Sequence, residues 1–200
     1  IEIGCGGTLK KILDSFSKVN LLWIVFSAEG VREKEALKSA SLLTKEALNK
    51  EIRTLSFRDS FFPYQGTEIK EYFEDIKAFN PDLIFTHYHK DLHQDHRQIS
   101  ELTLNTFRNH LILEYEIPKY DGDFGSPNIF ITLDEPICEE KIELIINGFK
   151  SQQDHPWFSA STFRAILRLR GIESNSPTGY AEAFYGRKIV INSDNGIKHR

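Results

Sequence analysis

The sequence predicts a Rossmann-like α/β fold, with a mainly parallel sheet that has helices on both faces, in a single domain over residues 1–200. Short apolar stretches of strand length, such as Leu21–Phe26 and Leu83–Thr86, alternate with longer segments whose apolar residues recur at helical spacing. Such alternation is typical of parallel sheets, because each helix returns the chain to the edge where the next strand starts.

The individual elements follow from these local patterns. Helices are expected at residues 9–16, 32–48, 69–76, 97–108, 142–149 and 160–170, where apolar side chains share one face. Strands are expected at residues 21–26, 51–57, 83–86, 128–132 and 183–191. Gly4, Gly6 and Gly7 are predicted to lead into the first helix, and the turn-rich residues 118–127 to form a surface loop.

Composition excludes several functional classes. A hydrophobic fraction of 40% predicts a folded globule, and a net charge of -4 without a basic block argues against nucleic-acid binding. No apolar run approaches the roughly 18 residues of a membrane span. Two cysteines, Cys5 and Cys138, argue against a disulfide framework and favour a reducing, cytoplasmic location. A small-molecule substrate is the expected partner, and homo-oligomerisation is left open.

The strongest functional signal is THYHKDLHQDH at residues 86–96, which holds four of the seven histidines and two aspartates. It begins at the carboxyl end of a predicted strand, where α/β sheets bind ligands. His93 and His96 are three residues apart, so one helical turn directs both side chains the same way. Imidazole is a common zinc ligand, and a carboxylate can bind the metal or orient a histidine, so the density of these residues at the end of a strand favours a zinc site. The alternative is a solvated loop in which Asp91 caps the following helix.

Residues 81–97 resemble the second signature of the PIG-L/LmbE family, a strand ending in Thr-His followed by Asp-x-His-x-Asp-His. Every fixed position of that pattern is met. Four shorter stretches are also similar to family motifs: residues 1–9, Arg32-x-x-Glu35, Ser151-Gln152 and residues 180–184. The resemblance implies a zinc-dependent N-deacetylase that removes the N-acetyl group from an amino-sugar conjugate of the N-acetylglucosamine type.

The resemblance also implies roles for individual residues. His96 is the expected metal ligand, for Zn²⁺ or another divalent cation, and His93 the group that stabilises the oxyanion or protonates the leaving amine. Asp95, or alternatively Asp91, is expected to hydrogen-bond a histidine, with Asp95 counted among the catalytic residues. The expected substrate-binding residues are Arg32, His87, Asp91 and Glu182. His89 is expected to be a bystander.

The sequence departs from the family pattern at two points. The family's first signature is His-Pro-Asp-Asp, which supplies the other zinc ligands and the general base. By its position in the family it is expected immediately before Ile1. The sequence also contains no methionine, which favours a natural start upstream of Ile1. Phe149 stands where a histidine often precedes Ser-Gln. One alternative is therefore a catalytically inactive family member that binds a sugar or nucleotide sugar. A nucleotide-binding protein using Gly4, Gly6 and Gly7 is a weaker alternative, because their spacing is not GxGxxG.

Overall fold

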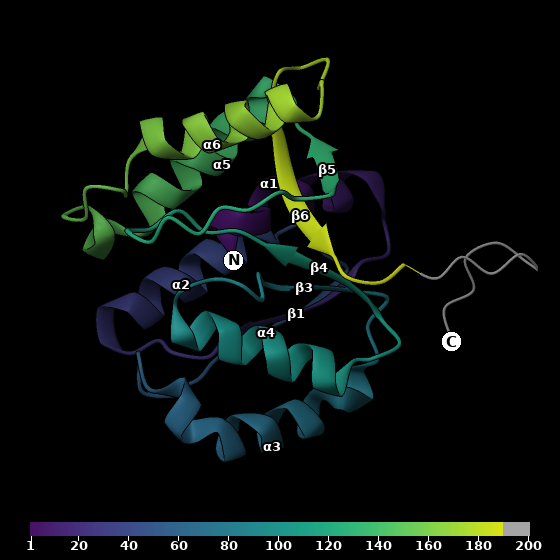
Figure 1. Ribbon diagram of the computed structural model, residues 1–200, viewed down its shortest axis with the longest axis vertical. Helices are drawn as coiled ribbons and strands as arrows, with labels where there is room; N and C mark the ends of the chain where they lie inside the picture. The colour runs from purple at the N-terminus through teal and green to yellow at the C-terminus, as the bar shows by residue number, and fades with distance from the viewer. Residues whose placement is uncertain (190–200) are drawn as a thin grey trace, which may run out of the picture. The chain divides into compact units, whose positions relative to one another are not determined.

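The computed structural model describes residues 1–189 (Figure 1). These residues fall into two compact units. The first unit comprises residues 1–58, 118–120 and 130–182, and the second comprises residues 59–117, 121–129 and those from 183 onward. Strand β6 (Ala181–Gly186) begins in the first unit and ends in the second. The expectation of a single domain over residues 1–200 stays a prediction.

The first unit is built from helices and a pair of parallel strands. Its elements are α1 (Glu2–Ser15), β1 (Asn20–Val25), α2 (Gly30–Leu43), β2 (Asn49–Thr54), most of β5 (Ile129–Thr132), α5 (Glu135–Gly148), the 3₁₀ turn η3 (Lys150–Gln152) and α6 (Ala160–Glu173). β1 and β2 pair in parallel, with Trp23 opposite Ile52. Helix α5 contacts α1, α2 and α6, so it lies at the centre of the helical packing.

Apolar side chains from α5, α6 and the segments beside them form the core of the first unit. This cluster consists of Leu133, Cys138, Ile142, Ile145, Phe158, Phe163 and Leu167. Removing these side chains from water is the main source of stability for helices of this length, since isolated helices of about 14 residues are marginal in water.

The second unit positions the histidine-rich segment. Its elements are η1 (Phe62–Gln65), α3 (Gly66–Ile76), η2 (Lys77–Phe79), β3 (Leu83–His87), α4 (Gln94–Thr106), β4 (Leu111–Tyr115) and the end of β6. The strand order is β3-β4-β6, with β3 and β4 parallel and β4 and β6 antiparallel. Helix α4 packs against both β3 and α3.

The α/β prediction is confirmed, although the sheets are small and partly mixed. Strand β4 was not among the predicted strands, because it follows α4 closely and carries a charged residue, Glu114, in a short apolar run. The predicted strand 183–191 corresponds to β6, and its residues 190 and 191 lie outside the described part of the chain. No helix within residues 1–189 is both long and apolar enough to span a membrane.

The first helix begins earlier than predicted, so Gly4, Gly6 and Gly7 lie inside α1. The backbone of α1 is bonded by side chains from other elements. The amides of Gly7 and Thr8 donate to the two carboxylate oxygens of Glu182, at 2.8 and 2.7 Å. The Ile3 carbonyl accepts from Lys141 Nζ at 2.6 Å, and Lys141 also bonds Glu182 at 2.6 Å. A buried ion pair therefore bonds the backbone of this helical turn.

Gly7 also lies too close to its neighbours to carry a side chain. A Cβ at this position would meet Leu133 Cδ1 at 2.5 Å and Glu182 Oε1 at 3.1 Å. Glycine therefore serves close packing here, at a position inside α1 and not in a loop that precedes it.

Candidate active site

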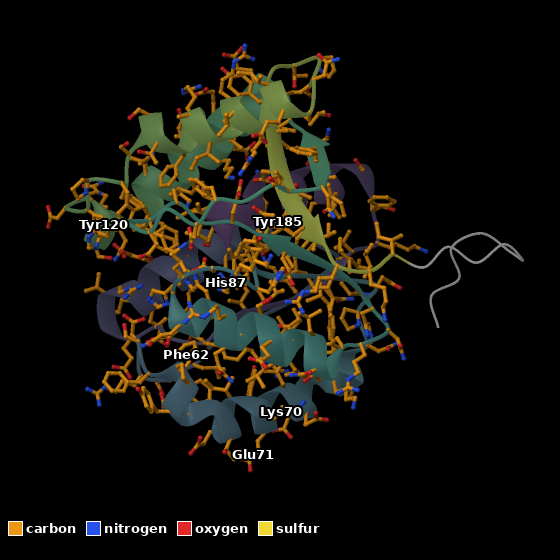
Figure 2. The ribbon with its side chains drawn as sticks, viewed as in Figure 1. Phe62, Lys70, Glu71, His87, Tyr120 and Tyr185 are labelled. Carbon is orange, nitrogen blue, oxygen red and sulfur yellow. The ribbon has the colours of Figure 1, made fainter. Side chains whose placement is uncertain are left out.

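The connection between β3 and α4 carries the histidine cluster. Strand β3 ends at His87 and α4 begins at Gln94, so residues 88–93 form the loop between them (Figure 2). The loop turns where the amide of Asp91 donates to the carbonyl of Tyr88 at 3.0 Å. The cluster therefore lies at the carboxyl end of a parallel strand, as predicted from the sequence.

Asp91 holds the two histidines that the sequence singled out. It is 1% exposed, and its Oδ1 accepts from the backbone amide of His93 at 2.7 Å. Its Oδ2 lies 2.9 Å from Nδ1 of His96. An ionised carboxylate accepts hydrogen bonds only, so the His96 ring carries a proton on Nδ1, and in the neutral ring Nε2 is left with its lone pair.

The imidazole rings pack directly on one another. His87 and His96 are stacked, with ring centroids 3.9 Å apart and planes inclined by 7°. The ring centroid of His93 lies 4.6 Å from that of His96. Tyr115 meets His87 edge-on at 4.9 Å. The predicted metal ligand, His96, and the predicted acid, His93, are therefore in contact with each other.

Asp95 bonds a different part of the chain. Its Oδ2 accepts from the amide of Ser60 at 2.6 Å and its Oδ1 from the amide of Phe62 at 3.1 Å. Only its backbone amide faces a histidine, donating to His93 Nδ1 at 3.3 Å. Of the two carboxylates that the sequence offered as a histidine partner, Asp91 makes that bond. The catalytic role expected for Asp95 stays a prediction.

Arg32 and Glu182, both expected to bind substrate, belong to the first unit. Arg32 is exposed in the first turn of α2, and its family partner Glu35 accepts from the amide and hydroxyl of Ser151 at 3.0 and 2.5 Å. Glu182 is 3% exposed and bonds α1 and Lys141 as described above. These contacts give Glu182 a structural role, and the substrate contacts of both residues stay predictions.

Two residues of the second unit were missed or set aside by the sequence analysis. Glu114 on β4 is fully buried, and its Oε2 accepts from both the amide and the Nδ1 of His89, at 3.0 and 2.6 Å. His89 is therefore paired with a carboxylate just as His96 is. The charged Glu114 inside the apolar run 111–115 could have indicated a buried functional residue, but only if that run had been predicted as a strand.

The residues of this loop fit part of a metal site. A histidine whose Nδ1 is held by a carboxylate is the usual form of a histidine ligand, and His96 with Asp91 has this form. Within residues 1–189, however, no group of three or more His, Cys, Asp or Glu side chains is arranged to hold a metal ion. The described chain therefore provides one well-oriented candidate ligand and not a full set.

A family model described as PIG-L, GlcNAc-PI de-N-acetylase, matches residues 1–107, which include the whole histidine cluster. The chain belongs to the PIG-L family. This confirms the resemblance read from residues 81–97, the most specific of the motifs in the sequence.

Solved structures share the fold of this PIG-L family chain. The conserved protein TT1542 from Thermus thermophilus has a TM-score of 0.72 at 17% identity, with 98% of this chain and 94% of that chain covered. N,N'-diacetylchitobiose deacetylase from Pyrococcus horikoshii has a TM-score of 0.67 at 22% identity, with 92% of this chain and 78% of that chain covered. GalB, the 4-carboxy-2-hydroxymuconate hydratase of Pseudomonas putida, has a TM-score of 0.72 at 12% identity, covering 96% and 93%. Deacetylation and hydration are therefore both found on this fold, and the fold alone does not determine the reaction.

Proposed function

We propose that this PIG-L family protein is a metal-dependent N-deacetylase, which hydrolyses the acetamide of an N-acetylated amino-sugar conjugate of the N-acetylglucosamine type. The family match supports the reaction class. The observation that carries the proposal is the bond of 2.9 Å between His96 and the buried Asp91, with His93 in contact with the same imidazole. A solvated loop does not need a buried carboxylate to orient a histidine.

In this proposal His96 is the chain's own ligand for Zn²⁺ or another divalent cation. Such an ion supplies a water of lowered pKa and polarises the substrate carbonyl. Asp91 orients His96, and the stacked His87 forms a wall of the site. Arg32 and Glu182 are proposed to contact the substrate, and the catalytic role of Asp95 is proposed from the family resemblance.

His93 is the proposed acid. Hydrolysis of an acetamide joins the oxygen of water to the acetyl carbon and breaks the bond between carbon and nitrogen, so the departing amine needs a proton. An imidazole beside the reacting carbonyl donates that proton, and also stabilises the negative oxygen while it exists. The amide of His93 is held by Asp91 at 2.7 Å, which fixes the position of this residue at the start of α4.

The test measures acetate release from N-acetylglucosamine conjugates, together with metal content, on protein expressed from its complete reading frame. We expect His93→Ala to lose roughly 10²- to 10⁴-fold in turnover while retaining metal. We expect His96→Ala to lose metal as well as activity. His110→Ala is the matched control, because His110 belongs to the same unit and bonds Asn80 at 3.1 Å instead of joining the cluster.

Full activity in His93→Ala would contradict the role of His93. A wild-type protein that binds the sugar conjugates without releasing acetate would instead support an inactive, sugar-binding family member.

A further inference from the structure

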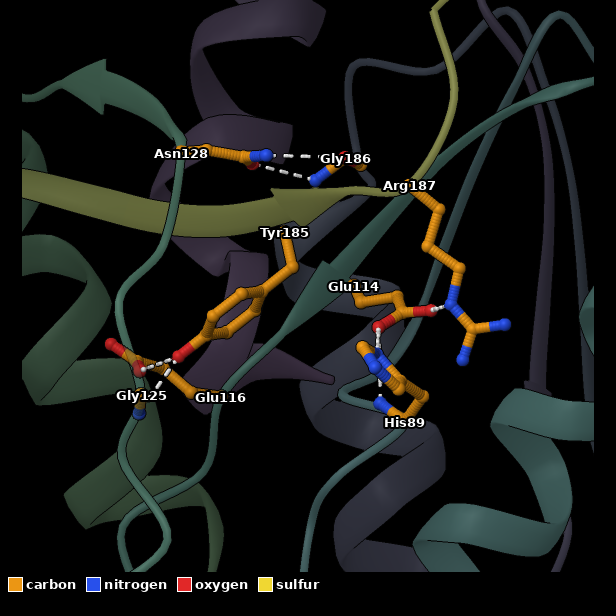
Figure 3. Close-up of polar contacts among 8 residues, drawn as sticks. All are labelled: His89, Glu114, Glu116, Gly125, Asn128, Tyr185, Gly186 and Arg187. Carbon is orange, nitrogen blue, oxygen red and sulfur yellow. Dashed lines mark hydrogen bonds and ion pairs between the residues drawn. The ribbon is translucent and has the colours of Figure 1, made fainter.

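Glu114 is a buried negative charge held by two positively charged or titratable side chains. It lies on β4 with no exposed surface, and its Oε2 accepts from the amide and ring nitrogen of His89. Arg187, just after β6, places its Nε 2.9 Å from Oε1. Figure 3 shows His89 and Arg187 on different oxygens of the one carboxylate. A charge so deeply buried is tolerated only when it is paired, which explains the two contacts on Glu114.

These contacts leave other nitrogen atoms of both side chains without a bond to Glu114. His89 uses Nδ1 on Glu114, so Nε2 remains, and its side chain is 30% exposed. Arg187 uses Nε, so both terminal nitrogens remain, and its side chain is 39% exposed. Within residues 1–189 none of these three nitrogens has a protein partner.

The His89 ring is also held from the side. Tyr88 meets it edge-on, with ring centroids 4.9 Å apart and planes at 76°. Tyr88 is stacked in turn on Tyr185 at 3.7 Å. The imidazole is therefore positioned before any ligand arrives, which reduces the entropy cost of binding.

We propose that His89 and Arg187 form a binding site for an oxyanion of the phosphate class. Arginine stays charged at all relevant pH values, and its planar fork of N–H groups matches the oxygens of a phosphate. His89 contacts the same carboxylate and adds its Nε2, which is a hydrogen-bond donor in the protonated ring. In that form His89 and Arg187 carry two positive charges against the single negative charge of Glu114.

Other carboxylates of the second unit limit the strength of this site. Glu116 accepts from the hydroxyl of Tyr185 at 3.3 Å, and Asp123 accepts from the amide of Leu92 at 2.8 Å. With Glu114 they raise the pKa of Tyr88, after the larger effect of burial. Their negative field opposes an anion, so binding depends on direct contacts with His89 and Arg187. Loss of the contact with His89 or Arg187 should therefore change the phosphate affinity more than loss of a neighbouring charge.

This proposal does not rest on the deacetylase reaction, because it concerns binding alone. The test titrates the full-length protein with inorganic phosphate at constant ionic strength, while NMR follows the imidazole ¹⁵N signals. His89 is assigned from the spectrum of His89→Gln. We expect a saturable shift of the His89 signals, and binding at least about tenfold weaker in Arg187→Gln, because a charge-assisted contact is lost.

Two further variants make the result specific. Lys188→Gln removes the adjacent exposed cation, whose Nζ bonds the carbonyl of Arg108 at 2.8 Å, and should leave the affinity within about twofold. Arg187→Lys keeps a positive charge opposite Glu114 but loses the planar fork of N–H groups, so this variant should bind phosphate with intermediate affinity. Circular dichroism tests whether each variant is folded. The proposal is overturned if His89 does not respond, or if Lys188→Gln weakens binding as much as Arg187→Gln.

Two sources of phosphate are distinguished by repeating the titration with N-acetylglucosamine 1-phosphate and with N-acetylglucosamine. Tighter binding of the sugar phosphate than of inorganic phosphate identifies the anion as part of a larger ligand, whereas equal affinity identifies a site for free phosphate. A shift of His89 by the uncharged sugar equal to that caused by phosphate would contradict an oxyanion site.

Discussion

Asp91 and Asp95 are both buried beside the histidines, but they bind different groups. Asp91 bonds the His96 ring and the His93 amide, whereas Asp95 bonds two backbone amides that precede η1 or begin it. Four residues apart in the sequence, the two carboxylates thus act on the candidate ligand and on the surrounding backbone respectively. Two aspartates of the same sequence motif therefore have different roles, Asp91 from the loop and Asp95 from the first turn of α4.

This difference predicts separate effects for Asp91→Asn and Asp95→Asn. An asparagine amide at position 91 donates towards Nδ1 of His96 and moves the ring proton to Nε2, so metal affinity should fall about 10- to 100-fold. At position 95 the amide loses an acceptor for one backbone N–H, so the free energy of unfolding should fall by about 1–3 kcal/mol.

Chelator competition and urea unfolding measure the two effects on the same pair of proteins. If Asp95→Asn lowers metal affinity as much as Asp91→Asn does, the assignment of Asp91 as the residue that orients His96 is wrong.

At the level of elements, α1 is shaped by residues far away in the chain. Glu182 from β6 and Lys141 from α5 bond its backbone, and Leu133 packs where Gly7 has no side chain. The helix therefore contains glycines that its own propensity disfavours. Tertiary contacts compensate for that cost, which is why the apolar pattern of the sequence predicts a later start for this helix.

Gly7→Ala and Gly6→Ala separate the two effects. The methyl group at position 7 meets Leu133 Cδ1 at 2.5 Å, so we expect this variant to lose about 1–3 kcal/mol of unfolding free energy. At position 6 the nearest atoms are 3.7 Å away, an ordinary contact, so alanine should gain up to about 1 kcal/mol from helix propensity. Thermal and urea unfolding provide the comparison, and equal losses in both variants would rule out the close approach at Gly7 as the cause.

For the whole molecule, family membership and fold define what is shared with other proteins, while the reaction depends on the site. The same fold is found in a deacetylase and in a hydratase.

The effect of burial on the pKa of ionisable side chains can be tested independently of any reaction. Cys5 and Cys138, both free and buried in the first unit, provide such a test.

Burial raises the pKa of both thiols, that of Cys138 from 9.0 to about 11 and that of Cys5 further. A raised pKa in the folded state means that the unfolded chain releases its protons first. The resulting stability is complete below pH 9 and is lost as the pH rises towards 11, by up to about 1.4 kcal/mol per pH unit for each thiol.

Urea unfolding between pH 8 and pH 10.5 should show this decline, and Cys138→Ala should show a shallower one. Thiol reagents should label the wild type at neutral pH only as fast as the buried region opens. Immediate labelling of both thiols in the folded protein would contradict this account.

The sequence by itself determined the α/β class, most of the helices and strands, and the family, because these depend on local periodicity and on a motif of contiguous residues. Tertiary structure decided which carboxylate orients which histidine. His89 finds Glu114 25 residues away and Asp95 finds Ser60 35 residues away, and Arg187 reaches Glu114 from beyond β6. Such partners are selected by strand order and packing, since a buried charge bonds whichever group the fold brings within reach. His89, a bystander in the motif, thereby becomes part of a proposed site.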